Sequence, residues 1–204
     1  MQPGHQRRIV TSSKAIKVGP WGGSGGSPWD DGAHRGVRSI TVTYGRFLES
    51  MRVEYVDWNG RPVLGEKHGG GTARSRSHKI ELDFPYEFVT GVSGSYRAAH
   101  GGSPPVVRSL TFATSRGKEH GPLGDADADG VPFSYPMEGG VVVGFTGRSG
   151  WHLDAVGLHV AALRRETLCD VVQERGLGAY RSFVYGSGGT ARHQSKRPFE
   201  WCYK

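Results

Sequence analysis

Long apolar runs and cysteines are scarce in this sequence. No apolar run among the 204 residues approaches the roughly 18 that a membrane-spanning helix needs. Arg7 and Arg8 are not followed by the apolar stretch of a secretory signal. The only two cysteines, Cys169 and Cys202, lie near the C-terminal end and cannot link the main part of the chain by disulfides. We therefore expect free thiols, no membrane span and a protein that is not secreted.

The central body of the chain has almost no net charge. The net charge of +7 is of the kind found in nucleic-acid-binding proteins. However, residues 14–163 contain 16 basic and 15 acidic residues, so nearly all of the excess lies in the two ends. Charges dispersed over chain ends are usually solvated. We therefore predict no nucleic-acid partner.

Motifs for phosphate binding, metal binding and nucleophilic catalysis are also missing. The glycine-rich segment 19–32 does not end in the Gly-Lys-Ser/Thr of a phosphate-binding loop, and no Gly-x-Ser-x-Gly motif occurs. Asp125, Asp127 and Asp129 are spaced like the first half of a calcium loop, but Pro136 stands where that loop needs a glutamate. The histidines show no zinc spacing. We predict no cofactor, no metal and no enzymatic activity. Spacing alone leaves open a carboxylate pair for glycoside hydrolysis, although no such pair is visible.

Glycine, by contrast, is abundant. The chain has 33 glycines, which disfavour helices because each interior glycine costs about 1 kcal/mol. Segments rich in β-branched and aromatic residues alternate with glycine-rich turns, a pattern typical of an all-β fold. We predict strands at 37–44, 51–56, 79–84, 107–113, 140–145 and 153–160. The first two should form a hairpin, and the continuously apolar 141–143 predicts a strand buried on both faces.

Two short sequences recur along the chain. VRSITV at 37–42 returns as VRSLTF at 107–112, and GVSG at 91–94 is similar to GFTG at 144–147. Repetition at these distances favours a prism or barrel of similar antiparallel units over a single sandwich.

We expect three parts along the chain. The domain should span 14–163, between a flexible leader at 1–13 and a C-terminal extension at 164–204. In the extension, 167–175 has the pattern of a short amphipathic helix that stops at Gly176, and the residues after it are expected to be poorly ordered.

The turn 150–154, directly before the last predicted strand, is the main candidate for a binding site. Its sequence, GWHLD, presents successive backbone N–H groups and then the carboxylate of Asp154. Donors and an acceptor that converge suit a sugar, because each sugar hydroxyl both donates and accepts hydrogen bonds. The turn therefore indicates carbohydrate binding.

A series of short motifs then follows in order through the domain. They are VGPWGGSGG at 18–26, WDDG at 29–32, GVRSI at 36–40, KIELDFP at 79–85, VSG at 92–94, VVRSLTF at 106–112, GP at 121–122, VGFTG at 143–147 and GWHLD at 150–154. In this order they resemble the jacalin-related lectins, a family known chiefly from plants. The resemblance implies a β-prism of three four-stranded antiparallel Greek-key sheets, with the C-terminal extension outside the prism. It also implies sugar binding without metal or catalysis, and suggests a stress or defence response.

The resemblance also assigns a sugar site at one end of the prism. The carbohydrate-binding residues that it implies are Gly26, Gly150, Trp151, His152, Leu153 and Asp154. The backbone of Gly26 is expected to face the N–H groups of Trp151 and His152, and the Asp154 carboxylate to accept from two sugar hydroxyls. A neighbouring loop at about 94–102, with Ser95, Tyr96 and Arg97, is expected to tune the preference for longer glycans.

The chain resembles the mannose-preferring members of the family. Galactose-preferring members have a proteolytically freed N-terminal glycine, whereas this chain runs unbroken into Trp21. We therefore expect mannose-containing glycans or glycoproteins as partners, with mannose and glucose types both accepted. As in the cytosolic mannose type, the expected compartment is the cytoplasm, with the nucleus as a second one.

A second interpretation keeps the fold and loses the sugar. Trp151 and His152 occupy variable loop positions and could narrow the site, which would leave a protein-interaction module on the same prism. The intact Gly26 and Asp154 favour the lectin. Because a single shallow sugar site binds with a dissociation constant on the order of 1 mM, about −4 kcal/mol, we expect a homo-oligomer that presents several sites.

Overall fold

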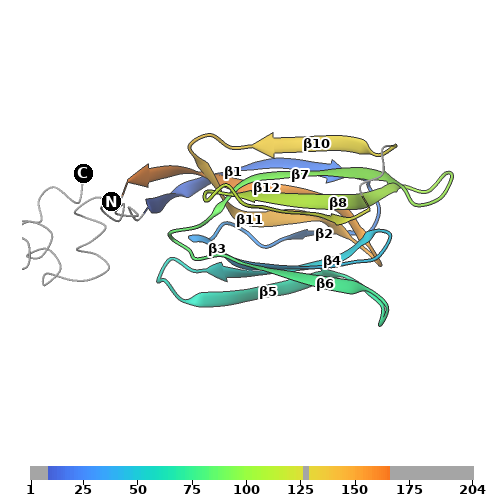
Figure 1. The fold of residues 1–204 in the computed structure, drawn as a ribbon, viewed down its shortest axis with the longest axis horizontal. Coiled ribbons are helices and arrows are strands. Elements are labelled where there is room, and N and C mark those ends of the chain that lie inside the picture. Colours follow the sequence, from blue (N-terminus) through green and yellow to red (C-terminus); the bar gives the residue numbers. More distant parts are fainter. Residues whose placement is uncertain (1–8, 126–128, 166–204) are drawn as a thin grey trace, which may run out of the picture. The chain divides into compact units, whose positions relative to one another are not determined.

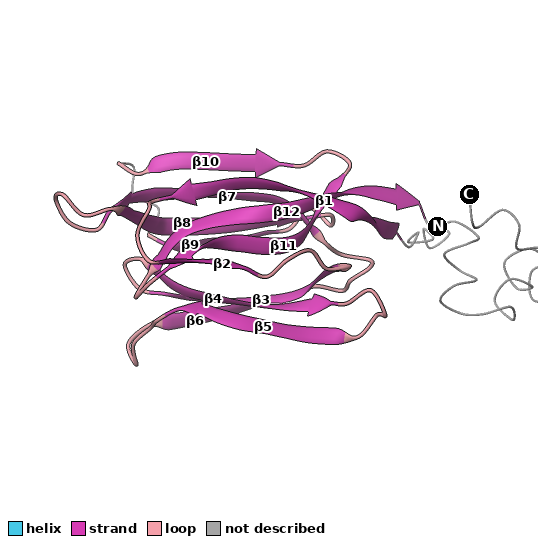
Figure 2. Cartoon of the chain, turned by 180° about the vertical axis from the view of Figure 1, so that it is seen from behind, coloured by secondary structure: helices cyan, strands magenta, loops and turns pink. Residues whose placement is uncertain are grey.

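The computed structural model describes residues 9–125 and 129–165 of the chain. In this part the chain forms twelve β-strands and no helix (Figures 1 and 2). In chain order the strands are β1 (Ile9–Gly22), β2 (Ser27–Asp30), β3 (Gly36–Tyr44), β4 (Leu48–Val56), β5 (Pro62–Gly69), β6 (Arg76–Glu81), β7 (Val89–Ala98), β8 (Pro105–Thr114), β9 (Glu119–Gly124), β10 (Val131–Pro136), β11 (Gly140–Ser149) and β12 (Leu153–Arg165). The predicted all-β class is confirmed. Within these ranges, accordingly, no helix is present that could cross a membrane.

The strands form three antiparallel sheets of four strands each. Their strand orders are β5-β4-β3-β6, β10-β7-β8-β9 and β1-β12-β11-β2. In the first two sheets, three consecutive strands lie side by side and the fourth returns beside the first, which is Greek-key order. The third sheet follows the same order through the two ends of the chain, because β1 lies beside β12 and β2 returns beside β11. The predicted β-prism is therefore confirmed (Figure 1).

Apolar side chains from all three sheets meet in one core. In β3, Ile40 and Val42 are fully buried, whereas Thr41 between them is only partly buried, as period-two alternation requires. β3 pairs with β4 as the predicted hairpin. Phe112 of β8 and Phe145 of β11 are fully buried and pack edge to face, with ring centroids 6.2 Å apart. Full burial of such side chains stabilises the fold by about 1.5–3 kcal/mol each.

The continuously apolar stretch of β11 is buried on both faces, as predicted. Val141, Val142 and Val143 have no exposed surface. Val142 belongs to the main core, while Val141 and Val143 belong to a second cluster with Ala161. Phe88 packs against this second cluster and helps to cover it.

One of the two sequence repeats falls on equivalent strands. β7 and β11 are each the first strand of a Greek key, and they carry GVSG and GFTG. A Cβ on Gly94 would lie 2.1 Å from the Ser109 carbonyl oxygen, and one on Gly147 would lie 2.1 Å from that of Ala155. The repeat therefore marks the same close approach of neighbouring strands in two sheets. The other repeat lies on β3 and β8, which hold different places in their sheets.

Several strands, and the limits of the domain, differ from the sequence-based prediction. Six strands were not predicted, namely β1, β2, β5, β7, β9 and β10. Five of these are edge strands, whose mostly exposed residues leave little alternation to read, and β7 is interrupted by glycines. β1 begins at Ile9, inside the predicted leader 1–13, and β12 continues to Arg165, beyond the predicted boundary at 163. The predicted helix at 167–175 and both cysteines lie outside the described residues.

Candidate functional site

Three connections lie at the end of the prism opposite the start of β1 and the end of β12 (Figure 1). They join β1 to β2 (23–26), β7 to β8 (99–104) and β11 to β12 (150–152). The N–H of Gly23 donates to the carbonyl of Asp154 at 2.9 Å. A Cβ on Gly23 would lie 2.1 Å from the carbonyl oxygen of Pro105. The three connections are therefore neighbours in space, although they are far apart in the sequence.

The β1–β2 connection packs directly against the Asp154 carboxylate because its glycines have no side chains. A Cβ on Gly25 would lie 2.5 Å from Oδ1 of Asp154, and a Cβ on Gly26 would lie 2.5 Å from Oδ2. Gly26 also has a φ of +58°, a conformation that glycine adopts without strain. The structure thus brings Gly26 and Asp154 together, and only glycine fits at this place.

Arg148 holds the same connection from the opposite strand. Its Nε donates to the carbonyl of Gly25 at 2.8 Å, and its Nη2 donates to the carbonyl of Gly26 at 2.7 Å. Both carbonyls are thereby tied to β11, which restrains the orientation of the peptide groups around Gly26. Sequence reasoning missed Arg148, because no local pattern links residues more than 100 positions apart.

Asp154 is the one carboxylate among the predicted sugar-site residues, and it is only 9% exposed. Burial raises the pKa of its carboxyl above the usual 3.8, although the Gly150 N–H and the nearby positive groups of His152 and Arg148 act in the opposite direction. Folding therefore places this group where its charge is poorly solvated. A ligand that donates hydrogen bonds to it would compensate for the lost solvation.

The β11–β12 connection begins beside this carboxylate, because a Cβ on Gly150 would lie 3.7 Å from Oδ2 of Asp154. The carbonyl of Trp151 accepts from the Gly70 N–H at 3.1 Å, and the carbonyl of His152 accepts from the Gly150 N–H at 3.0 Å. Among the described residues, no hydrogen bond from the N–H of Trp151 or His152 is present outside the strand pairings. The Leu153 side chain is fully buried in the core, so only its backbone could face a ligand. Gly150 is adjacent to Gly26, because a Cβ on it would lie 3.5 Å from the Gly26 Cα.

The two ring side chains of this connection differ in their surroundings. Trp151 is 63% exposed and leaves much of its indole accessible. The His152 ring packs edge-on against Phe47 of the β3–β4 turn, with centroids 5.0 Å apart. Phe47 was not predicted as a site residue, because the sequence does not show which turn lies next to His152.

The predicted secondary loop needs correction. Ser95 and Tyr96 lie inside strand β7, and the connection itself begins at Ala99. Ser95 is 7% exposed and hydrogen-bonds Ser109, and Tyr96 packs against the core. Of these three residues, only Arg97, whose side chain is 46% exposed, is accessible to a ligand. The loop was expected from the family resemblance, which does not show how far strand β7 extends in this chain.

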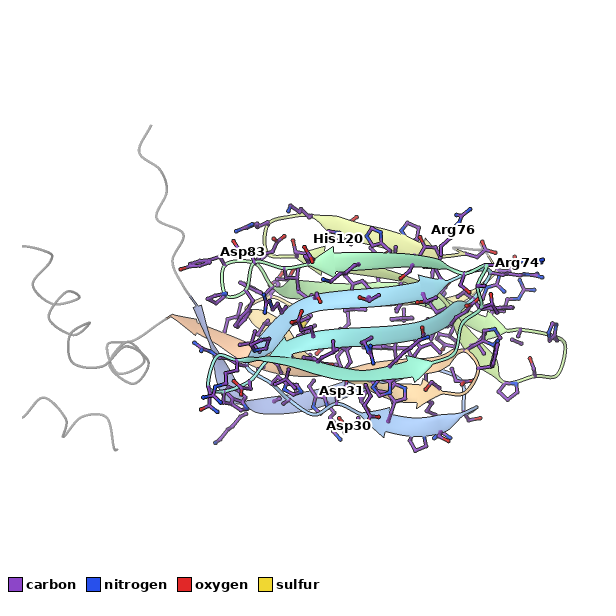
Figure 3. The ribbon with its side chains drawn as sticks, turned by 90° about the horizontal axis from the view of Figure 1, so that it is seen from below. Asp30, Asp31, Arg74, Arg76, Asp83 and His120 are labelled. Atoms are coloured by element: carbon purple, nitrogen blue, oxygen red, sulfur yellow. The ribbon has the colours of Figure 1, made fainter. Side chains whose placement is uncertain are left out.

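A separate acidic and histidine cluster lies around the end of β2. Asp31 accepts hydrogen bonds from His68 and Tyr55, each at 2.6 Å, and burial followed by the Asp31 charge raises the pKa of Tyr55. Asp30 pairs with His159 at 2.6 Å and with Lys17. Figure 3 shows Asp30 and Asp31 side by side. Each carboxylate is matched by partners from other strands, so the cluster joins the sheets, and within the described residues no group of three or more ligands suits a metal ion.

The chain matches a family model described as "Jacalin-like lectin domain" over residues 18–159. The chain belongs to the jacalin-like lectin family. This jacalin-like lectin is 44% identical over 156 residues to jacalin-related lectin 19 of Arabidopsis thaliana. The matched region covers 76% of this chain and 86% of that protein. Some other curated relatives are longer, and the match spans only 26% of one and 51% of another.

Solved structures of jacalin-like lectins agree in fold. The mannose-binding lectin from champedak is 47% identical, with a TM-score of 0.67 over 74% of this chain and 99% of that chain. A mannose-specific jacalin-related lectin from Morus nigra, solved with mannose, is 43% identical, with a TM-score of 0.67 over 74% of this chain and 96% of that one. The protein is thus a carbohydrate-binding lectin of a non-enzymatic family, as the sequence predicted.

Proposed function

We propose that this lectin binds mannose- or glucose-type glycans between the β1–β2 and β11–β12 connections. The observation that carries the proposal is the Asp154 carboxylate, which lies against the bare backbone of Gly25 and Gly26 and close to Gly150, where the turn that contains the N–H groups of Trp151 and His152 begins. Two neighbouring hydroxyls of one sugar could donate to the carboxylate and accept from the N–H groups at the same time. This arrangement needs neither a metal ion nor a catalytic group.

Two further observations favour mannose over galactose. The lectins from champedak and Morus nigra, which are described as mannose-binding and mannose-specific, are 47% and 43% identical to this chain. The sequence also runs from β1 through Trp21 into Gly26, as expected for mannose-preferring members, whereas galactose-preferring members have a freed N-terminal glycine.

Trp151 supports the proposal as a stacking surface. Its exposed indole lies over Gly70, since a Cβ on Gly70 would come within 3.4 Å of the ring. The apolar face of a sugar ring can pack against an aromatic face, and pairs of aromatic rings, a comparable contact, contribute about 0.5–1.5 kcal/mol. Trp151 would therefore add to affinity.

We also infer that the lectin acts as a homo-oligomer. β1 is an edge strand of its sheet, and Ile16 on it is 63% exposed, an apolar side chain on an open edge. Sedimentation velocity of the wild type and of Ile16→Asp tests this. A faster-sedimenting wild type that becomes a monomer in the variant supports the inference, and a wild-type monomer at all concentrations overturns it.

Retention on immobilised mannose, compared with immobilised galactose, tests the proposed function. We expect selective retention on mannose, elution by free methyl mannoside, and loss of retention in Asp154→Ala. Glu66→Ala is the matched control, because Glu66 is an exposed carboxylate on β5. Retention of Asp154→Ala equal to that of the control would overturn the assigned site. A folded protein retained on neither resin would favour the protein-interaction module.

A further inference from the structure

A basic cavity of about 240 Å³ adjoins the proposed sugar site. It is lined by Arg46 from the β3–β4 turn, by Arg97, Ala98 and residues 99–101 from the end of β7 and its loop, and by Arg108 from β8. The lining contains three arginines and His100, and no acidic residue. The cavity is smaller than the roughly 300–1,000 Å³ of pockets that enclose drug-sized ligands, so it has room for about one sugar residue or its charged substituent.

Phe47 connects this cavity to the sugar site. One neighbour of its ring is the His152 ring, with centroids 5.0 Å apart. The guanidinium carbon of Arg108 lies over the Phe47 ring at 4.8 Å, and that of Arg46 at 5.9 Å. Gly23 of the β1–β2 connection also lies against Pro105, which directly follows the β7–β8 connection that lines the cavity. A glycan seated on Asp154 could therefore extend into the cavity with its next residue.

The three arginines of the cavity differ in their ion pairs with acidic side chains. Arg108 is nearly buried, with 3% of its side chain exposed, and one nitrogen contacts Asp125 at 3.1 Å. Arg97 pairs with Asp129 at 3.1 Å, but both side chains are well exposed, and an exposed pair of this kind contributes little. For Arg46, no ion pair with another described residue is present. Arg46 and Arg97 are thus the positive groups that a ligand could engage at small cost.

We propose that this cavity binds an anionic group, a carboxylate or a phosphate or sulfate ester, on the sugar next to the bound mannose. Guanidinium groups suit this role because they donate two parallel hydrogen bonds to the paired oxygens of such groups. Arg108 forms a fixed positive wall, while Arg46 and Arg97 contact the anion. The lectin therefore prefers acidic glycans over neutral ones. This inference rests on the proposed mannose site, since the acidic glycan reaches the cavity from Asp154.

Calorimetry with matched neutral and acidic ligands tests the proposal. The first pair is mannobiose and mannobiose phosphorylated at C6 of its reducing-end sugar, which is the sugar next to the bound mannose, and the second is mannosyl-glucose and mannosyl-glucuronic acid. We expect at least one acidic member to bind about tenfold more tightly than its neutral partner, which corresponds to about 1.4 kcal/mol. The pair with the larger ratio identifies whether the cavity takes a tetrahedral anion or a carboxylate. The ratio should decrease in about 1 M salt, where the Debye length is about 3 Å.

Charge-matched variants separate this cavity from the net charge of the protein. Arg46→Gln with Arg97→Gln should reduce the ratio of acidic to neutral affinity to about one, with both affinities measured on the variant itself. Arg52→Gln with Arg61→Gln, at exposed positions of β4 and of the turn that follows it, removes the same charge, is the control and should leave the ratio intact. Neutral ligands that bind while the acidic ones show no advantage would overturn the acidic preference alone. Failure of both kinds of ligand to bind would instead overturn the mannose site, and with it this inference.

Discussion

Asp154→Asn is the sharpest test of the proposed sugar site, because it removes a charge and leaves the shape. A dissociation constant of 1 mM corresponds to about −4.1 kcal/mol of binding free energy. A hydrogen bond to a charged group contributes about 1.5–3 kcal/mol, and the carboxylate would accept two. Losing even one of them should weaken mannose binding at least about tenfold, and Asp154→Ala should abolish measurable binding.

The same change should not weaken the fold. Burial raises the pKa of Asp154, so at neutral pH the ionised carboxylate is less favourable in the folded state than in the unfolded one. A neutral amide in its place should leave the melting temperature unchanged or slightly higher. The backbone bond from Gly23 to the Asp154 carbonyl remains in either variant.

Titration calorimetry with methyl mannoside, alongside thermal melts, provides the assay, with Glu66→Gln as the matched control. In the wild type, affinity should fall as pH is lowered through the raised pKa of Asp154, because the protonated carboxyl can no longer accept from both hydroxyls. An Asp154→Asn variant that binds mannose within about twofold of the wild type would refute the reasoning. A variant that fails to bind because it is unfolded would be recognised by its melt.

Three further predictions concern residues around the site and the sheets. Gly26→Ala should lose mannose retention and destabilise the fold by about 2–4 kcal/mol in chemical denaturation. The reasons are the positive φ of Gly26 and the oxygen 2.5 Å from the added Cβ. Gly101→Ala, which has open space around it, should show neither effect. Trp151→Ala should weaken mannose binding about two- to tenfold in calorimetry with no change in melting temperature, and an unchanged affinity would argue against stacking. Burial would raise the pKa of Asp30, but the hydrogen bonds of its carboxylate lower this pKa to about 2. The ionised Asp30 therefore stabilises the fold above about pH 4, and this contribution is lost as the pH falls towards 2. It is at most about 1 kcal/mol, because the side chain is 36% exposed. Denaturant melts of Asp30→Asn over this range should show a flatter pH dependence than the wild type, and parallel curves would contradict the assignment.

Much of the fold was predictable because it depends on local patterns. The alternation in β3 and β4 shows which side of each strand is buried, and the apolar run 141–143 marks a strand covered on both faces. The edge strands β1, β2, β5, β9 and β10, together with β7, were not predictable in the same way. Their residues are mostly exposed or glycine, and they become strands because a neighbouring strand offers hydrogen bonds.

The all-β class could be read from the pattern of strands and glycine-rich turns, and the family and the two loops with Gly26 and Asp154 from the ordered motifs that resemble jacalin-related lectins. The surroundings of these residues could be known only from the folded chain. Arg148 reaches Gly25 and Gly26, and residues from two sheets form the basic cavity beside Phe47. These contacts join positions far apart in the chain, and they exist because three separately paired sheets close around one core and bring their turns to the same end.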